Sequence, residues 1–267
     1  MNQTPVTLDT PDNYFQLLDR SSIDHWWGRG IERIERCWTK HAIRQRQLIN
    51  DKRLNWLDAG CGSGARLLQW SGWGCWGRLV GIDPEIQSGM KLSGKENLQI
   101  ELKKGHLPEM QLKGDRFDLI TTFDVIQHVS FEARRQAIGE MVDHLAVNGL
   151  LLIRTNASGF FRRKLNDRSI VRPEFLDECL KENGLKPLRR CHFNLTGSLA
   201  EDIPAYLTNR KRNNDQPLKH GLPNGWQKRP GGSLPGRMAG WAESQIAATG
   251  LVKLPFGHSY IMLATKE

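Results

Sequence analysis

The residues best suited to chemistry form a turn in which an acid precedes three alternating glycines. Asp58 is followed by Gly60, Gly62 and Gly64, and the preceding residues 53–57 alternate in polarity as a strand does. Apolar residues after the glycines are spaced as on one face of a helix. Glycine lets the backbone turn sharply and lets a ligand approach closely, and the first N–H groups of a helix lack partners within it. Such a strand-to-helix turn is where an α/β sheet binds a nucleotide-like cofactor.

A second acid indicates which cofactor fits the turn. Asp83 ends a predicted strand over residues 78–82, and a carboxylate at that place can accept hydrogen bonds from both hydroxyls of a ribose. Dinucleotide-binding turns use Gly-x-Gly-x-x-Gly against a pyrophosphate, whereas here the third glycine comes one residue earlier. The negative charge of Asp58 would repel a pyrophosphate. It suits a cationic ligand, such as the amino group and sulfonium of S-adenosylmethionine.

The elements that must position these residues alternate between strand and helix patterns. The predicted strands cover residues 53–57, 78–82, 98–103, 117–122, 150–154, 187–194 and 258–264, and the predicted helices cover residues 31–49, 133–145 and 173–182. This alternation predicts a parallel sheet covered on both faces. We therefore expect an α/β fold: a doubly wound, mostly parallel, seven-stranded sheet of Rossmann-like type, with an N-terminal helical section and a C-terminal insertion.

Three sections divide the chain. Residues 1–50 are expected to form an N-terminal helical section that covers the cofactor site. Residues 51–195 are expected to form the cofactor-binding core. Residues 196–267 contain a basic insertion followed by the final strand. Residues 196–249 show no periodic pattern and are too long for an ordinary loop, so we expect a substrate cap there.

The composition excludes several classes of protein. No apolar run approaches the roughly 20 residues that cross a bilayer, and the N-terminus lacks the pattern of a signal peptide. The five cysteines are scattered and include no C-x-x-C pair. Reduced thiols, no metal and a cytoplasmic location are therefore expected.

The positive charge is concentrated in the C-terminal part of the chain. The net charge is +9, and residues 160–240 contain sixteen Lys and Arg against eight Asp and Glu. A basic surface can recruit anionic substrates, nucleic acid or lipid head groups, and it can equally be a solvated surface. The sequence does not determine the oligomeric state.

At this point the chain resembles a known family, the class I S-adenosylmethionine-dependent methyltransferases. The resemblance lies in four segments that agree with the family in order and spacing: residues 57–64, residues 80–83, residues 117–129 and residues 145–153. They span the predicted core from its first strand to its fifth. The resemblance implies that the chain is a methyltransferase and that S-adenosylmethionine is its cofactor.

The resemblance also implies a role for individual residues. The glycines would pass close to the methionine portion, Asp58 would reach its amino group, directly or through water, and Asp83 would hold the ribose. Many relatives carry an acid where His106 stands; a neutral imidazole could accept from the adenine amine in its place. The expected cofactor-binding residues are Arg29, Asp58, Ala59, Gly60, Cys61, Gly62, Gly64, Asp83, Pro84, His106, Leu107, Phe123 and Asp124.

The reaction implied by the resemblance is an in-line attack of an acceptor atom on the sulfonium methyl. An alcohol or phenol acceptor would benefit from a general base, and histidine titrates in the right range. His128 follows the fourth predicted strand and is the best placed by this logic; His25, His220 and His258 are further candidates. An amine acceptor needs no strong base, so no catalytic residue is assigned.

Three functions stay open at this stage. The first is methyl transfer to a small-molecule acceptor, at an oxygen of a glycan precursor, a lipid or a secondary metabolite. The second is methylation of nucleic acid or protein held by the basic C-terminal part, against which stands the lack of an Asn-Pro-Pro-Tyr-like element and of an RNA-binding module. The third is a regulator that binds S-adenosylmethionine without turnover.

Overall fold

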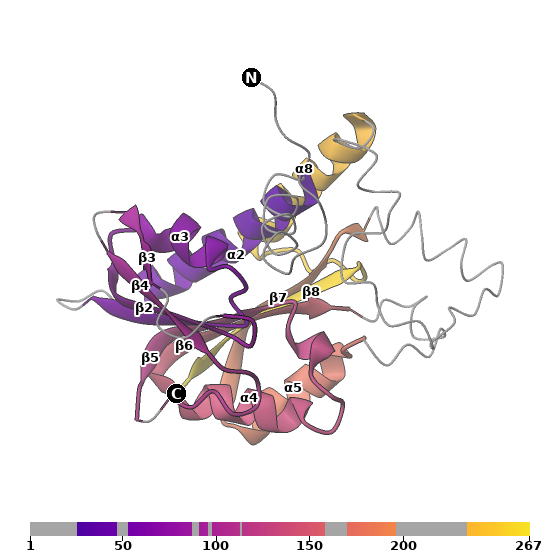
Figure 1. Cartoon of the computed structure of the whole chain (residues 1–267). Helices are drawn as coiled ribbons and strands as arrows, with labels where there is room; N and C mark the ends of the chain where they lie inside the picture. The colour runs from indigo at the N-terminus through magenta and orange to yellow at the C-terminus, as the bar shows by residue number, and fades with distance from the viewer. Residues whose placement is uncertain are drawn as a thin grey trace, which may run out of the picture.

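A single sheet of eight strands organises the molecule in the computed structural model of the chain (Figure 1). The structure describes residues 26–46, 53–86, 91–95, 98–112, 114–157, 170–195 and 234–267. The strands are β1 Leu54–Ala59, β2 Trp76–Asp83, β3 Lys91–Ser93, β4 Gln99–Lys104, β5 Phe117–Phe123, β6 Leu145–Asn156, β7 Leu185–Phe193 and β8 Ser259–Lys266. Their order across the sheet is β3-β4-β2-β1-β5-β6-β8-β7.

The sheet is mostly parallel, as predicted. β1 pairs in parallel with β2 and β5, while β2 continues to β4 and β5 continues to β6. β8 runs antiparallel between β6 and β7, and β3 runs antiparallel at the opposite edge. The carboxyl ends of β1, β2, β4, β5 and β6 therefore meet at one edge of the sheet, where α/β folds bind ligands.

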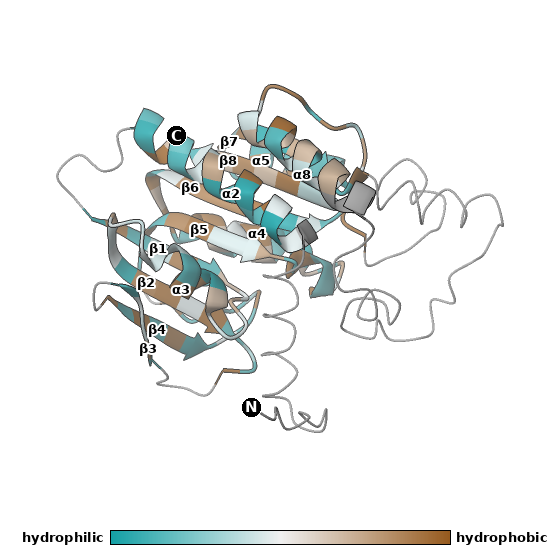
Figure 2. Cartoon of the chain, turned by 90° about the horizontal axis from the view of Figure 1, so that it is seen from above, coloured by the Kyte–Doolittle hydropathy of each residue, from teal (hydrophilic) through white to brown (hydrophobic). Residues whose placement is uncertain are grey.

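Helices cover both faces of this sheet, which confirms the doubly wound fold (Figures 1 and 2). α2 Trp26–Gln45, α3 Ala65–Ser71 and α8 Leu234–Thr249 lie over one face. α4 Arg134–Asp143 and α5 Pro173–Glu182 lie over the other. A short 3-10 helix, η2 Ile126–His128, follows β5.

Each face has its own apolar core. Under α2, α3 and α8 the core is rich in tryptophan: Trp56 contacts both Trp70 and Trp76 with ring centroids 5.3 and 5.1 Å apart. Two of these indoles donate hydrogen bonds to buried oxygens, so their polar edges are satisfied. The opposite core consists of aliphatic side chains, Met and Phe packed under α4 and α5. These tryptophans are therefore packing residues.

The sheet differs from the sequence-based expectation in two places. It has eight strands rather than seven, because Lys91–Ser93 adds a short antiparallel strand outside β4. The strand expected over residues 150–154 begins at Leu145 and includes residues 148–149, where Asn148 has a φ of 62° and the pairing with β5 shifts register.

The helices at the two ends of the chain also differ from expectation. α2 begins at Trp26 rather than at residue 31, so Arg29 lies on a helix. α8 occupies the last part of residues 196–249, where no element was predicted. The rest of the predicted substrate cap, residues 196–233, lies outside the described residues. Among the described helices, none is long and apolar enough to cross a membrane.

Candidate functional site

The glycine turn has the geometry that its sequence predicts. Gly60, Gly62 and Gly64 have φ angles of 82°, 54° and 81°, a region that side chains other than glycine rarely adopt. A Cβ on Gly60 would lie 2.1 Å from Cγ2 of Val125, so the loop after β5 packs directly against the turn. A Cβ on Gly62 would meet no described atom within 4 Å. The turn thus presents bare backbone to the open space above it.

Asp83 fixes this turn from the end of the neighbouring strand. Its Oδ2 accepts a hydrogen bond of 2.9 Å from the N–H of Gly62, and its Oδ1 accepts one of 3.1 Å from the N–H of Glu85. A carboxylate offers about four acceptor positions. Both oxygens can therefore accept a further hydrogen bond from a ligand.

Asp58 lies beneath the turn and is almost fully buried. It is 1% exposed, and its Oδ1 accepts a 2.6 Å hydrogen bond from the hydroxyl of Thr121, which in turn accepts from the indole N–H of Trp56 at 2.9 Å. Burial raises the pKa of Asp58 to about 7, against the opposing effects of the Thr121 hydrogen bond and of Arg66 and Arg154. A nearby cation would stabilise the charged form of Asp58.

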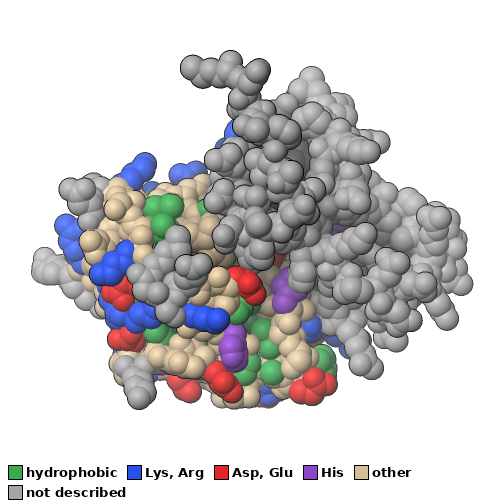
Figure 3. All heavy atoms as spheres, in the orientation of Figure 1, with side chains coloured by type: hydrophobic (Ala, Val, Ile, Leu, Met, Phe, Trp, Pro, Cys, Tyr) green, Lys and Arg blue, Asp and Glu red, His purple; other side chains and the backbone are tan. Residues whose placement is uncertain are grey.

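An apolar cavity of about 190 Å³ opens beside the turn. The ends of β1, β2 and β4 and the loop after β5 line it. The predicted site residues that it brings together are Ala59, Gly60, Pro84, His106, Leu107 and His128. The two histidine side chains are exposed. Histidine side chains reach the described surface beside apolar ones in the space-filling view (Figure 3).

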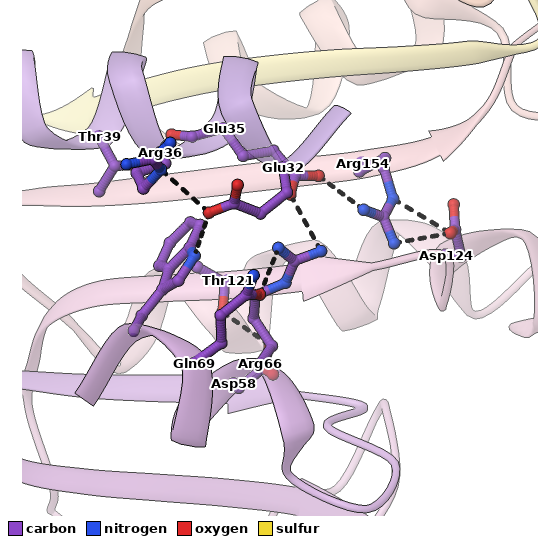
Figure 4. A network of polar contacts seen from close by, with 11 residues as sticks. Glu32, Glu35, Arg36, Thr39, Asp58, Arg66, Gln69, Thr121, Asp124 and Arg154 are labelled. Atoms are coloured by element: carbon purple, nitrogen blue, oxygen red, sulfur yellow. Dashed lines mark hydrogen bonds and ion pairs between the residues drawn. The ribbon is translucent and has the colours of Figure 1, made fainter. Parts of the chain in front are cut away.

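A network of mostly buried charges forms a wall where α2 and α3 meet the ends of β5 and β6 (Figure 4). Arg154, at the end of β6, donates to Asp124 from Nε and Nη2 at 3.0 and 2.8 Å and to Glu35 on α2 from Nη1 at 2.7 Å. Glu35 also lies 3.4 Å from Nη2 of Arg66, in the first turn of α3. Both guanidinium groups contact the ring of Phe123: the ring centroid lies 5.1 Å from Cζ of Arg66 and 4.9 Å from Cζ of Arg154.

Sequence reasoning did not identify Glu35 or Arg66 as site residues. A signal for Glu35 existed, because it falls on the apolar face of α2 between Ile31, Ile34 and Trp38, all of which are buried. A carboxylate on the buried face of a helix needs a charged or hydrogen-bonding partner. Arg66 carried no such signal, since one arginine in the first turn of a helix is ordinary.

A further buried charge holds the segment that carries His128. Arg134 donates from Nε to the carbonyl of Val129 at 3.1 Å and from Nη2 to the carbonyl of Gln127 at 3.1 Å. The carboxamide oxygen of Gln127 accepts from the hydroxyl of Thr155 and the N–H of Asn156 at the end of β6. The backbone on both sides of His128 is therefore fixed.

Each of the other predicted residues belongs to a different part of the chain. Cys61 is buried in the turn. Arg29 is exposed on α2. His258 precedes β8, and its carbonyl accepts from the N–H of Ala157 beyond β6. His25 and His220 lie outside the described residues. Within the described chain, no group of three or more metal-binding side chains lies together.

Together, the doubly wound sheet, the glycine turn and the acids at the ends of β1 and β2 define an α/β enzyme that binds a nucleotide-like cofactor. The chain belongs to the methyltransferase domain family, whose family model matches residues 31–189. It is a class I S-adenosylmethionine-dependent methyltransferase, and S-adenosylmethionine is its methyl donor.

Solved structures share the fold over nearly the whole chain. An S-adenosylmethionine-dependent methyltransferase from Clostridium acetobutylicum is similar with a TM-score of 0.51 at 12% identity, covering 96% of this chain and 97% of that one. A TehB-like S-adenosylmethionine-dependent methyltransferase from Corynebacterium glutamicum is similar with a TM-score of 0.50 at 16% identity, with the same coverage. No curated protein matches the sequence.

The site residues fit this methyl donor. The open space at Gly62 gives the ligand direct access to backbone. The apolar cavity suits a flat heterocycle such as adenine, and the acids Asp58 and Asp83 match the cationic and hydroxyl groups of the donor.

Proposed function

We propose that this methyltransferase binds S-adenosylmethionine across the glycine turn, with the adenine in the cavity beside His106 and the ribose on Asp83. The methionine portion then lies over Gly60–Gly64, toward Asp58 and Phe123. The apolar cavity and the separate charged wall support this placement, since an apolar ring and a zwitterion need different surroundings.

We further propose a small-molecule acceptor, at an oxygen of a glycan precursor, a lipid or a secondary metabolite. The observation that carries this proposal is the burial of the charged wall. α2 packs so closely over the end of β6 that Glu35 is 0% exposed and Arg154 is nearly buried. A polymer needs an open groove at the reacting end, whereas a wall closed by α2 favours a small acceptor.

The donor supplies an activated methyl group, so the protein has to align the acceptor and exclude water. His128 and His258 lie on the edge of the sheet that carries the site, and either is placed to accept the proton of an alcohol. We retain residues 1–50 and 196–267 as the sections that cover the acceptor.

Transfer of a labelled methyl group tests this proposal. The purified chain is incubated with S-adenosylmethionine labelled in the methyl group and a fractionated cell extract, and the products are separated by size. Label in the low-molecular-mass fraction is the expected result. Label that stays with macromolecules and is released by nuclease or protease would instead support methylation of nucleic acid or protein.

A further inference from the structure

Glu35 is the most buried charge of the site and the acid that joins its two arginines. Its Oε1 accepts a 2.7 Å hydrogen bond from Arg154, and its Oε2 lies 3.4 Å from Nη2 of Arg66. Oε2 accepts no hydrogen bond from any described residue. Among the described ion pairs, Glu35 is the carboxylate that contacts both guanidinium groups.

The two arginines need such a partner because they lie near each other beside the ring of Phe123 and their charges repel. Burial lowers the pKa of Arg66; the charge of Glu35 raises it, and the charge of Arg154 lowers it further. Burial raises the pKa of Glu35 itself, while Arg154 and Arg66 lower it. With Asp124 as the second acid, two positive and two negative charges balance in this wall (Figure 4).

The wall adjoins the turn that holds the donor. Arg66 comes two residues after Gly64, and the N–H of Asp124 donates to the carbonyl of Arg154 at 2.9 Å, so the ends of β5 and β6 are joined there. Asp58 interacts electrostatically with Arg66, Arg154 and Glu35. A charge placed over the turn therefore lies in the field of all these groups.

We propose that Glu35 is a positioning residue that balances Arg66 and Arg154, so that the site prefers the cationic sulfonium of S-adenosylmethionine over the neutral thioether of S-adenosylhomocysteine. This inference rests on the proposed placement of the methionine portion over the glycine turn. Without the carboxylate, the wall carries a surplus positive charge that opposes the sulfonium. The amino and carboxylate groups are the same in both ligands, so their effects cancel in the comparison.

The ratio of the two dissociation constants tests this inference without any acceptor. Calorimetry at pH 8 gives Kd for S-adenosylmethionine and for S-adenosylhomocysteine with the wild type and Glu35→Gln. Glu35→Gln is expected to weaken the binding of S-adenosylmethionine about fivefold relative to that of S-adenosylhomocysteine. This is the effect expected of one unit charge acting over several ångströms in a partly solvated site. Arg66→Gln removes the opposite charge and should shift the ratio in favour of S-adenosylmethionine.

Two further variants separate charge from shape. Glu32→Gln is the control, since Glu32 lies on the same helix, pairs with Arg36 and the indole of Trp70, and acts on Arg66 more weakly than Glu35 does. It should change the ratio less than about twofold, because its charge is already balanced by Arg36. The double variant Glu35→Gln with Arg66→Gln restores the charge balance and should return the ratio toward the wild-type value.

If Glu35→Gln weakens the binding of both ligands equally, the inference is overturned. The same holds if the ratio of dissociation constants does not recover in the double variant. Neither result contradicts the proposed cofactor site. Wild-type protein that binds neither ligand would overturn the proposed placement of the donor and the inference with it.

Discussion

At the scale of single residues, Asp83 both holds the glycine turn and is the proposed ligand of the ribose. A substitution of Asp83 should weaken cofactor binding before it affects folding. Its carboxylate fixes the N–H of Gly62 and is the proposed acceptor for the ribose hydroxyls. Asp83→Ala should weaken binding of S-adenosylhomocysteine about tenfold to a hundredfold, since hydrogen bonds to charged groups contribute about 1.5–3 kcal/mol. Asp83→Asn keeps an acceptor oxygen, so its affinity for S-adenosylhomocysteine should fall less than that of Asp83→Ala. Unchanged affinity in Asp83→Ala, measured by calorimetry, would show that the ribose lies elsewhere.

The pH dependence of stability is a second residue-scale prediction, and it concerns Asp58. Burial raises its pKa from 3.8 to about 7 in the folded state. Between these values the folded protein holds a proton that the unfolded chain has released, so this contribution is present at low pH and is lost as pH rises through 7. Relative to Asp58→Asn, the wild type should lose stability between pH 4 and pH 8. Urea unfolding at several pH values measures this difference; a constant difference between the two proteins contradicts it.

At the scale of elements, the glycine turn offers a test in which one glycine serves as the control for another. Gly62 and Gly74 both have positive φ, 54° and 72°, and a Cβ at either would meet no described atom within 4 Å. Alanine at each should cost a similar amount, about 1–2 kcal/mol of strain. Gly62→Ala should also weaken cofactor binding, because the methyl group projects toward the ligand. Equal affinity of the two variants for S-adenosylhomocysteine would place the ligand away from the turn.

One buried indole joins α2 to α8. Trp38 is buried on α2 and donates a 3.0 Å hydrogen bond to the carbonyl of Ala247 on α8. Trp38→Phe loses this bond and leaves a small void, so we expect a loss of about 1–3 kcal/mol in the free energy of unfolding. Cys37→Ser, at the exposed neighbouring position, should change stability by less than about 0.5 kcal/mol. Equal denaturation midpoints for the two variants would rule out this role for Trp38.

The sequence predicted the elements that have strong periodicity and missed those that depend on distant partners. The sheet and α5 Pro173–Glu182 follow from local pattern, and the helix has the predicted bounds. α8 does not follow from local pattern, because its buried positions are the small or polar residues Gly240, Glu243, Ser244 and Ala247. Their burial depends on α2, which is about two hundred residues away in sequence.

The candidate site divides in the same way. Acids and glycines at strand ends could be predicted, because parallel strands bring their carboxyl ends to one edge. In the charged wall, the apolar face of α2 marks Glu35 as a buried acid, but its pairing with Arg66 and Arg154 could not be predicted. The three residues come from three elements, and no spacing in the sequence links them. The roles assigned to the predicted cofactor residues stay predictions, which the binding experiments test.

At the scale of the whole molecule, one sheet connects the two cores, and the proposed ligand contacts the ends of four of its strands. β1, β2, β4 and β5 all border the turn or its cavity, so a bound ligand joins parts that must separate on unfolding. S-adenosylhomocysteine at 100 times its Kd should stabilise the fold by about 2.7 kcal/mol. For a chain of this size that corresponds to a rise in Tm of about 5–10 °C in one transition. NAD at the same concentration is the control, because Asp58 disfavours a pyrophosphate. A larger rise in Tm with NAD would contradict the proposed ligand. A rise confined to one of two transitions would contradict a single cooperative sheet.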